Sequence, residues 1–94
     1  MLMADDSPFE WDPTKRERNL QKHGVDFIRA VQVLHGRVLW RPDTRRQYGE
    51  PRLLLTGEAD GLILTLVVTP RGTRWRIISA RKASTDERRA YRGI

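Results

Sequence analysis

Two arginines, a histidine with its neighbouring lysine, and one glutamate are the residues of this 94-residue chain whose types suit chemistry on a phosphate group. They are Arg52, Arg76, His23, Lys22 and Glu50. A guanidinium offers parallel donors that match phosphate oxygens. An imidazole titrates near neutral pH and a carboxylate accepts protons, so both suit general acid or base work. The set predicts a site that binds phosphate and moves protons.

Each of these residues also has a purely structural interpretation. Lys22 and His23 come just before Gly24, and cations at the end of a helix stabilise its last carbonyl groups. Glu50 and Arg52 are two positions apart, so on a strand they share a face and form a surface ion pair. The residue pattern leaves both interpretations open. The other histidine, His35, is interpreted as structural or incidental.

The overall charge favours a polyanionic partner. Lys and Arg number 18 against 12 Asp and Glu, which gives a net charge of +6. Nucleic acid, an anionic membrane surface or an acidic protein would each be attracted. Further candidate contacts to a nucleic acid are the cations and one aromatic ring, which could stack on an unpaired base. They are Lys15, Arg18, Arg74, Arg81, Arg88 and Tyr48.

Composition excludes several classes of protein. The chain has no cysteine, which excludes disulfides and thiolate metal sites, and its two histidines are too isolated for a convincing metal site. No cofactor is expected. The longest apolar run is far too short to span a bilayer, and no signal peptide is apparent, so we expect a cytoplasmic protein with no membrane partner.

Helix signals divide the chain clearly. Asp12 and Pro13 predict the start of a helix that runs to about His23 and ends at Gly24. One face of this helix is basic and is formed by Lys15, Arg18, Asn19 and Lys22. A second helix is predicted from Asp26 to Gly36, with its buried stripe formed by Phe27, Ala30, Val31 and Leu34. A short third helix is predicted after Ser84, which forms a capping-box pattern with Glu87.

Strand signals predict two hairpins and two short strands, near residues 9–11 and 38–40. Asp60-Gly61 predicts a turn that pairs Leu55 with Leu66 and Leu53 with Val68. A second turn at Arg71-Gly72 would pair Val68 with Trp75. Both hairpins then place one apolar set on the core face: Leu53, Leu55, Leu64, Leu66, Val68, Trp75 and Ile77. The other face, expected to be an exposed surface, holds Arg52, Leu54, Thr56, Thr65, Val67, Thr69, Arg74, Arg76 and Ile78.

These elements predict a small α+β domain. Its antiparallel sheet would combine a three-stranded C-terminal meander with one or two short strands. Two N-terminal helices and a short C-terminal helix would accompany the sheet. A single domain over residues 9–94 would follow a disordered extension of residues 1–8.

Three segments together resemble the BrnT family of toxins from bacterial type II toxin–antitoxin systems. They are "FEWDPTKRERNLQKHGVDFIRAVQVL", "YGEPRLLLTG" and "RWRIISARKASTDERRAY", and the likeness covers roughly residues 9–91. It implies a RelE-like fold and a metal-independent endoribonuclease that arrests translation. It also implies a BrnA-type antitoxin that carries a ribbon–helix–helix region. Toxin and antitoxin would form a hetero-oligomer, for which a heterotetramer is one candidate. The pair would regulate its own operon, with the toxin meeting operator DNA only through the antitoxin.

The resemblance gives the candidate residues roles in cleaving RNA by attack of the 2′-hydroxyl on the adjacent phosphate. Arg52 and Arg76, with Arg81 as a further candidate, would stabilise charge on phosphorus. His23 would be the acid or base, supported by Lys22, and Glu50 the second-choice base. Two non-catalytic alternatives stay open: an inactive partner and co-repressor of the antitoxin, and a plain RNA-binding module.

Overall fold

The computed structural model describes residues 7–45 and 47–93. Its five strands form one sheet in the order β1-β5-β4-β3-β2. Along the chain the elements are β1 (Phe9–Glu10), α1 (Pro13–His23), α2 (Phe27–Ala30), the 3₁₀-helix η1 (Val31–His35), β2 (Val38–Pro42), β3 (Leu53–Ala59), β4 (Leu62–Arg71), β5 (Arg74–Lys82) and α3 (Thr85–Arg92). The α+β class is confirmed. The sheet is mixed, however, because β1 runs parallel to β5 while the other pairs are antiparallel.

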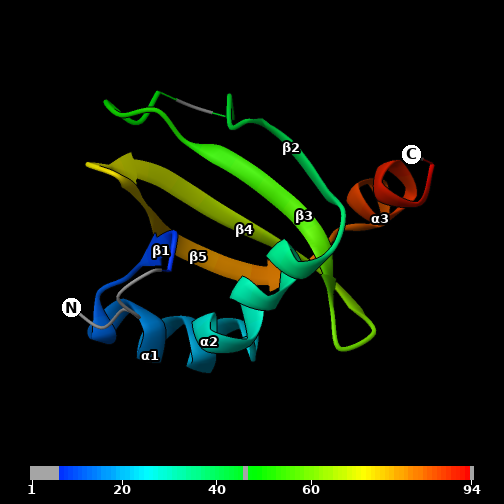
Figure 1. The fold of residues 1–94 in the computed structure, drawn as a ribbon, viewed down its shortest axis with the longest axis horizontal. Coiled ribbons are helices and arrows are strands. Elements are labelled where there is room, and N and C mark those ends of the chain that lie inside the picture. Colours follow the sequence, from blue (N-terminus) through cyan, green and yellow to red (C-terminus); the bar gives the residue numbers. More distant parts are fainter. Residues whose placement is uncertain (1–6, 46, 94) are drawn as a thin grey trace.

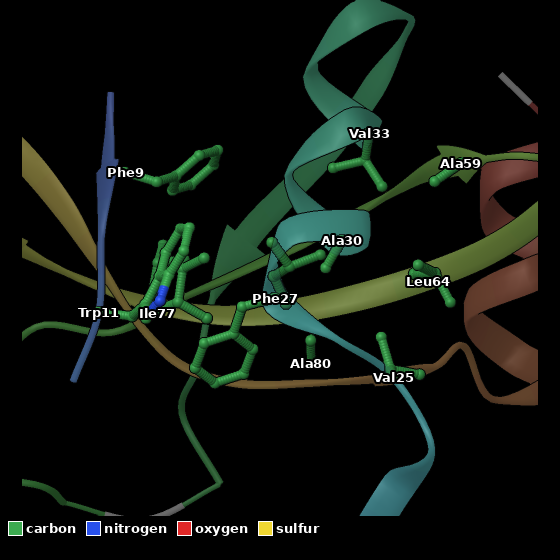
Figure 2. Close-up of a cluster of buried hydrophobic side chains, with 12 residues drawn as sticks. Phe9, Trp11, Val25, Phe27, Ala30, Val33, Ala59, Leu64, Ile77 and Ala80 are labelled. Carbon is green, nitrogen blue, oxygen red and sulfur yellow. The ribbon is translucent and has the colours of Figure 1, made fainter. Parts of the chain in front are cut away.

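The core lies between the sheet and the N-terminal helical elements. Figure 1 shows α1, α2 and η1 along one side of the sheet, with α3 apart from them beside the strand ends. Side chains from both layers meet in one cluster (Figure 2). The predicted core face is confirmed: Leu64, Leu66, Val68 and Ile77 are fully buried, and Leu53, Leu55 and Trp75 pack against them partly buried. The predicted extension falls mostly outside the described residues, which begin at Ser7.

The first helix begins and ends where its signals predict. The carboxylate of Asp12 accepts a hydrogen bond from the Thr14 backbone N–H at 2.9 Å, and Gly24 ends α1 with a φ of 71°. A left-handed residue at this position favours glycine, because a side chain there meets the backbone.

The second helix departs from its prediction. It is α-helical for only one turn and continues as the 3₁₀-helix η1. Since a 3₁₀-helix has three residues per turn, the buried stripe runs Phe27, Ala30, Val33. The predicted inclusion of Leu34 was wrong, because its side chain is 41% exposed. A Cβ on Gly57 would lie 2.8 Å from the Cβ of Val33, so η1 packs directly on β3 only because residue 57 is glycine.

The first hairpin has the predicted register. Leu53 pairs with Val68 and Leu55 with Leu66. Asp60 and Gly61 both have positive φ values, 51° and 80°. Two positive values define the turn whose twist matches that of the flanking strands.

The second predicted register was wrong by two residues. Arg71 pairs with Arg74, so the turn consists of Gly72 and Thr73. Gly72 has a φ of 58° and takes the first turn position, where the prediction had placed it second. Val68 therefore pairs with Ile77. A two-residue slip keeps every side chain on its face, which explains why the core assignment survived.

A β-bulge interrupts β5 at Ile78. Val67 pairs with Ser79 while Val68 pairs with Ile77, which leaves Ile78 as the extra residue. Because a bulge reverses the alternation beyond it, Ala80 joins the core face and Arg81 turns to the other face beside Thr65.

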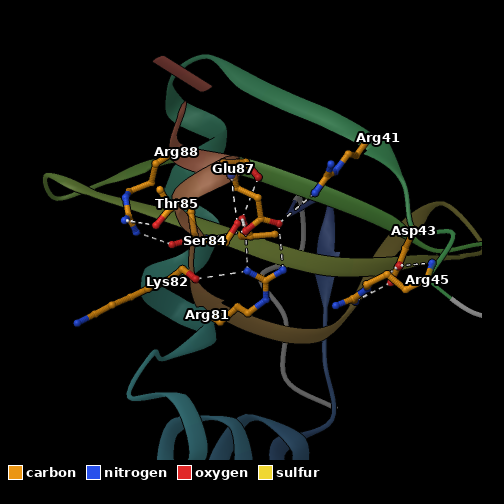
Figure 3. Close-up of polar contacts among 12 residues, drawn as sticks. Arg41, Asp43, Arg45, Arg81, Lys82, Ser84, Thr85, Glu87 and Arg88 are labelled. Carbon is orange, nitrogen blue, oxygen red and sulfur yellow. Dashed lines mark hydrogen bonds and ion pairs between the residues drawn. The ribbon is translucent and has the colours of Figure 1, made fainter. Parts of the chain in front are cut away.

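The second face of the sheet is largely buried, which corrects the prediction of an exposed surface. Its residues Leu54, Thr56, Thr65, Val67 and Thr69 are all buried. At one end, the Thr65 hydroxyl donates to Glu87 of α3 at 3.0 Å. Arg81 donates to both oxygens of Glu87, at 2.6 Å and 3.0 Å, and Arg41 approaches within 3.4 Å (Figure 3). The predicted capping box between Ser84 and Glu87 is confirmed.

Glu87 should make the stability of this fold depend on pH. Burial raises the pKa of its carboxyl, but the hydrogen bonds from Arg81, the Ser84 N–H and Thr65 outweigh burial and lower the pKa to about 2. A lowered pKa stabilises the fold above the unfolded value of 4.5, and this stabilisation is lost as the pH falls from there toward 2. We expect Glu87→Gln to lower the free energy of unfolding at pH 7 by on the order of 3 kcal/mol.

Urea denaturation at several pH values tests this expectation. The difference between wild type and Glu87→Gln should shrink as the pH falls below 4.5. Glu58→Gln is the matched control, because Glu58 is exposed on β3. A difference that stays constant down to pH 2.5 would show that the charge of Glu87 is unimportant.

Candidate functional site

A groove of about 500 Å³ gathers basic side chains from three parts of the chain. The end of α1, the segment before β3, and the facing strands β4 and β5 all contribute to it. Its lining, named here the cationic groove, consists of Lys22, His23, Arg45, Tyr48, Arg52, Val67, Ile78 and Ser79. Four residues predicted from sequence, Lys22, His23, Tyr48 and Arg52, thus come together around the bulge of β5.

Asn19 holds the end of α1 against β5. Its Nδ2 donates to the carbonyl oxygens of Ala80 at 2.8 Å and Val25 at 2.9 Å, and its Oδ1 accepts from the Ala80 N–H at 3.1 Å. The short strand β1 pairs only with Trp75 and Arg76, so the side chain of Asn19 takes the place of a neighbouring strand at Ala80. Lys22 and His23 follow within about one turn. Asn19 therefore fixes where these two side chains meet the sheet.

The opposite wall of the groove is organised by Asp43, whose side chain is fully buried. Arg45 donates to both of its oxygens at 2.8 Å. These bonds outweigh burial, and with the Arg45 N–H and the Tyr48 hydroxyl they lower the pKa of Asp43 to about 2. The N–H of Asp43 also donates to the carbonyl oxygen of Arg52 at 2.9 Å. Asp43 thus fixes Arg45 and Tyr48 through its carboxylate, and the backbone of Arg52 through its N–H.

Arg52 is held in place yet keeps free hydrogen-bonding capacity. Its guanidinium carbon lies 4.0 Å from the centroid of the Tyr48 ring, and its Nη2 lies 3.6 Å from Glu50. Its Nε is buried and has no acceptor among the described residues. A guanidinium fixed in this way loses little entropy when it binds an anion. Because Arg52 covers one face of the Tyr48 ring, stacking on a base would use the other face.

Glu50 is held in its ionised form. The Thr69 hydroxyl lowers the pKa of its carboxyl, as do the positive charges of Arg52 and Arg71. The same hydroxyl lies 2.6 Å from the Pro51 carbonyl oxygen, and with a single proton it serves one acceptor at a time. At neutral pH Glu50 is therefore a proton acceptor that also orients Arg52.

The remaining candidates lie around the groove or away from it. Lys15 and Arg18 line an adjoining hollow of about 210 Å³ together with Lys22 and His23. Arg76 pairs with Thr69 across β4 and β5, and its Nη2 lies 3.7 Å from Glu10. Arg74 lies beside the second turn, opposite Arg71.

Arg81 and Arg88 belong to the packing of α3. The guanidinium of Arg81 binds Glu87, and that of Arg88 donates to the Ala83 carbonyl oxygen at 2.7 Å. Neither lines the cationic groove. Sequence reasoning missed three groove determinants: Arg45, Asp43 and the anchoring role of Asn19. A signal for Asn19 was present, because asparagine is a poor residue for the interior of a helix unless its amide has a partner.

The described part of the chain offers neither a cluster of metal ligands nor a membrane-spanning helix. Residues 7–45 and 47–93 contain no group of three His, Asp or Glu side chains placed to hold a metal ion. Within the same ranges no helix is both long and apolar enough to cross a membrane.

The fold and the cationic groove define a small basic α+β domain with a site suited to a polyanion. Comparison with known families matches residues 11–87 to the family described as ribonuclease toxin, BrnT, of type II toxin–antitoxin system. The chain therefore belongs to this family of ribonuclease toxins, and the predicted resemblance is confirmed. Membership implies an RNA substrate and an antitoxin protein as partner. No curated protein matches the chain.

The anchoring role of Asn19 is open to a direct test. We expect Asn19→Ala to lower the free energy of unfolding by about 1–3 kcal/mol, because it leaves the backbone groups of Ala80 unpaired. Amide hydrogen exchange should accelerate at Ala80. Asn19→Asp should not restore stability, because a carboxylate accepts from the Ala80 N–H but cannot donate to the carbonyl oxygens. Gln21→Ala, on the exposed side of α1, serves as the control, and equal stability of the three variants would contradict the role.

Proposed function

We propose that this toxin is an endoribonuclease that cleaves RNA in the cationic groove without a metal ion, by attack of the ribose 2′-hydroxyl on the adjacent phosphate. One observation carries the proposal. The end of α1 brings Lys22 and His23 into the same groove as Arg52 and Tyr48, although about 30 residues separate them in sequence. A titratable ring, fixed guanidinium groups and an aromatic ring are the parts that such a reaction needs.

The reaction requires two proton transfers and one exchange of bonds at phosphorus. The 2′-oxygen loses its proton and bonds to phosphorus, and the bond from phosphorus to the 5′-oxygen breaks. The products are a 2′,3′-cyclic phosphate and a 5′-hydroxyl that has gained a proton. His23 takes part as the base or the acid, with Lys22 beside it. Glu50, ionised near Arg52, is the second-choice base, an alternative to His23 as proton acceptor.

Positive charge in the groove can stabilise the phosphorane-like transition state. Arg52 lines the groove with its guanidinium, and Lys22, exposed at the end of α1, adds an ammonium. Arg76, on the same face beside Thr69, extends this charge along the sheet. Lys15, Arg18 and Arg74 are placed to hold flanking phosphates. Such contacts raise affinity with little dependence on base sequence.

The proposal also covers the fold type, the cellular compartment and the antitoxin of this toxin. The domain would be RelE-like, act in the cytoplasm and arrest translation. A BrnA-type antitoxin with a ribbon–helix–helix region would neutralise it in a hetero-oligomer, and the pair would repress its own operon. Family membership supports these assignments.

Cleavage of a defined RNA in the presence of EDTA tests the mechanism. We expect His23→Ala to reduce the rate by about 10²–10⁴-fold, because it removes a general acid or base. Arg52→Ala should reduce the rate by about 10²–10³-fold, because the negative charge that develops on the phosphate in the transition state loses a hydrogen-bond donor. The pH profile of the wild type assigns the role of His23: a rate that rises through the imidazole range indicates a base, and one that falls indicates an acid.

The other histidine is the matched control for this experiment. His35 lines a separate hollow with Glu58 and Tyr91, so His35→Ala should cleave at the wild-type rate. Wild-type activity of His23→Ala would reject the acid–base assignment. Loss of all cleavage in EDTA would reject metal independence, and products without a cyclic phosphate would reject attack by the 2′-hydroxyl.

Expression in a bacterial host without the antitoxin separates an enzyme from a non-catalytic binder. We expect growth arrest from the wild type and normal growth from His23→Ala and Arg52→Ala at equal protein level. His35→Ala should arrest growth. Normal growth with the wild-type chain would favour an inactive partner or an RNA-binding module.

A further inference from the structure

A second groove lies on the core face of the sheet and differs from the first in the chemistry of its lining. Its volume is about 440 Å³, and its lining, named here the apolar groove, consists of Pro8, Phe9, Leu34, Val38, Trp40, Leu53, Leu55 and Trp75. No charged side chain belongs to this lining. Trp40 is 62% exposed and Leu34 is 41% exposed. Large apolar side chains gathered and exposed in this way mark a surface that binds another protein.

The groove exists because the helical layer covers only part of the sheet. The helices α1 and α2 pack on β5, and η1 packs on β3 at Gly57. Toward β2 the core face of Leu53 and Leu55 has only partial cover. β2 is also the last strand of the sheet, and Figure 1 shows it at the outer edge. An apolar groove beside an open strand edge suits an extended or helical segment of a partner.

Chemistry decides among the possible occupants. RNA could stack a base on tryptophan, but this lining offers no cation to its phosphates. A second copy of the chain would bring another net charge of +6 to the contact, so electrostatic repulsion opposes it. An acidic protein segment with apolar side chains satisfies both the lining and the charge. The family membership of the chain supplies such a partner class, the antitoxin.

We propose that the apolar groove is the docking site of the antitoxin, filled by apolar side chains of a segment that carries acidic residues on its flanks. This inference rests on the proposed function, which makes the chain a toxin in need of neutralisation. The two grooves lie on opposite faces of the sheet: Leu53 faces the apolar groove, while Arg52, directly before it, faces the cationic groove. Docking and cleavage therefore use different residues and can be altered separately.

Protection of an introduced thiol tests the location, since the natural chain has no cysteine. The partner is the protein encoded by the reading frame adjoining the toxin gene, purified in complex with each variant. We expect the thiol of Leu34→Cys to react with a maleimide at least about tenfold more slowly in the complex than in the free toxin. Glu58→Cys, exposed near the opposite end of β3, should react equally fast in both. Equal rates for Leu34→Cys in the free toxin and the complex would overturn the proposal.

Affinity and activity measurements keep the two proposals distinct. Trp40→Ala should weaken binding of the antitoxin by about tenfold or more, as truncation of a buried aromatic anchor does, and should leave RNA cleavage by the free toxin unchanged. Unchanged affinity would overturn the docking site. The groove would belong to a second copy if the free toxin sediments as a dimer and the thiol of Leu34→Cys is already protected without the antitoxin. Absence of RNA cleavage by the free wild type would reject the proposed function and leave the thiol result standing.

Discussion

The contact between the side chain of Asn19 and the edge of β5 is the interaction on which the arrangement of the site depends. A helix with a single sizeable apolar residue, Leu20, itself 39% exposed, has little hydrophobic force to fix it on a sheet. One buried amide supplies the missing constraint: it donates to the carbonyl oxygens of Ala80 and Val25 and accepts from the Ala80 N–H. These hydrogen bonds act on a helix whose next turn carries the lysine and histidine of the cationic groove. A helix end that would otherwise be a solvated cluster of cations becomes one wall of a site.

The other wall is built on a different principle, a buried carboxylate. Asp43 lies at the end of β2, where a charge without partners would be very unfavourable. Its two hydrogen bonds from Arg45 satisfy it, and its N–H bond to Arg52 ties the loop to the start of β3. Each wall thus depends on one buried polar residue. The partners of Asn19 are backbone groups, and the carboxylate of Asp43 is bound mainly by Arg45. Such networks are specific because each partner that is lost leaves an unsatisfied group behind.

Local sequence signals predicted those features that depend on the conformation of a few neighbouring residues. The Asp60-Gly61 turn gave the correct register, since both positions need positive φ. At the second turn a lone glycine could occupy either position, and the prediction chose the wrong one. The bulge at Ile78 has no marker in the sequence, since neither glycine nor proline stands near it. Asn19 was assigned to a basic helix face, because its partner Ala80 lies 61 residues away and only the fold brings the two together.

The alternation of side chains along the strands therefore places two differently lined grooves on opposite faces of the sheet. Toward the helices, the face closes into a core over β4 and β5 and stays open beside β2, where tryptophan and leucine side chains are exposed. The opposite face carries Thr56, Thr65 and Thr69 together with Arg76 and Arg81, and is closed at one end by α3 and at the other by the segment before β3. Adjacent residues such as Arg52 and Leu53 consequently belong to different sites.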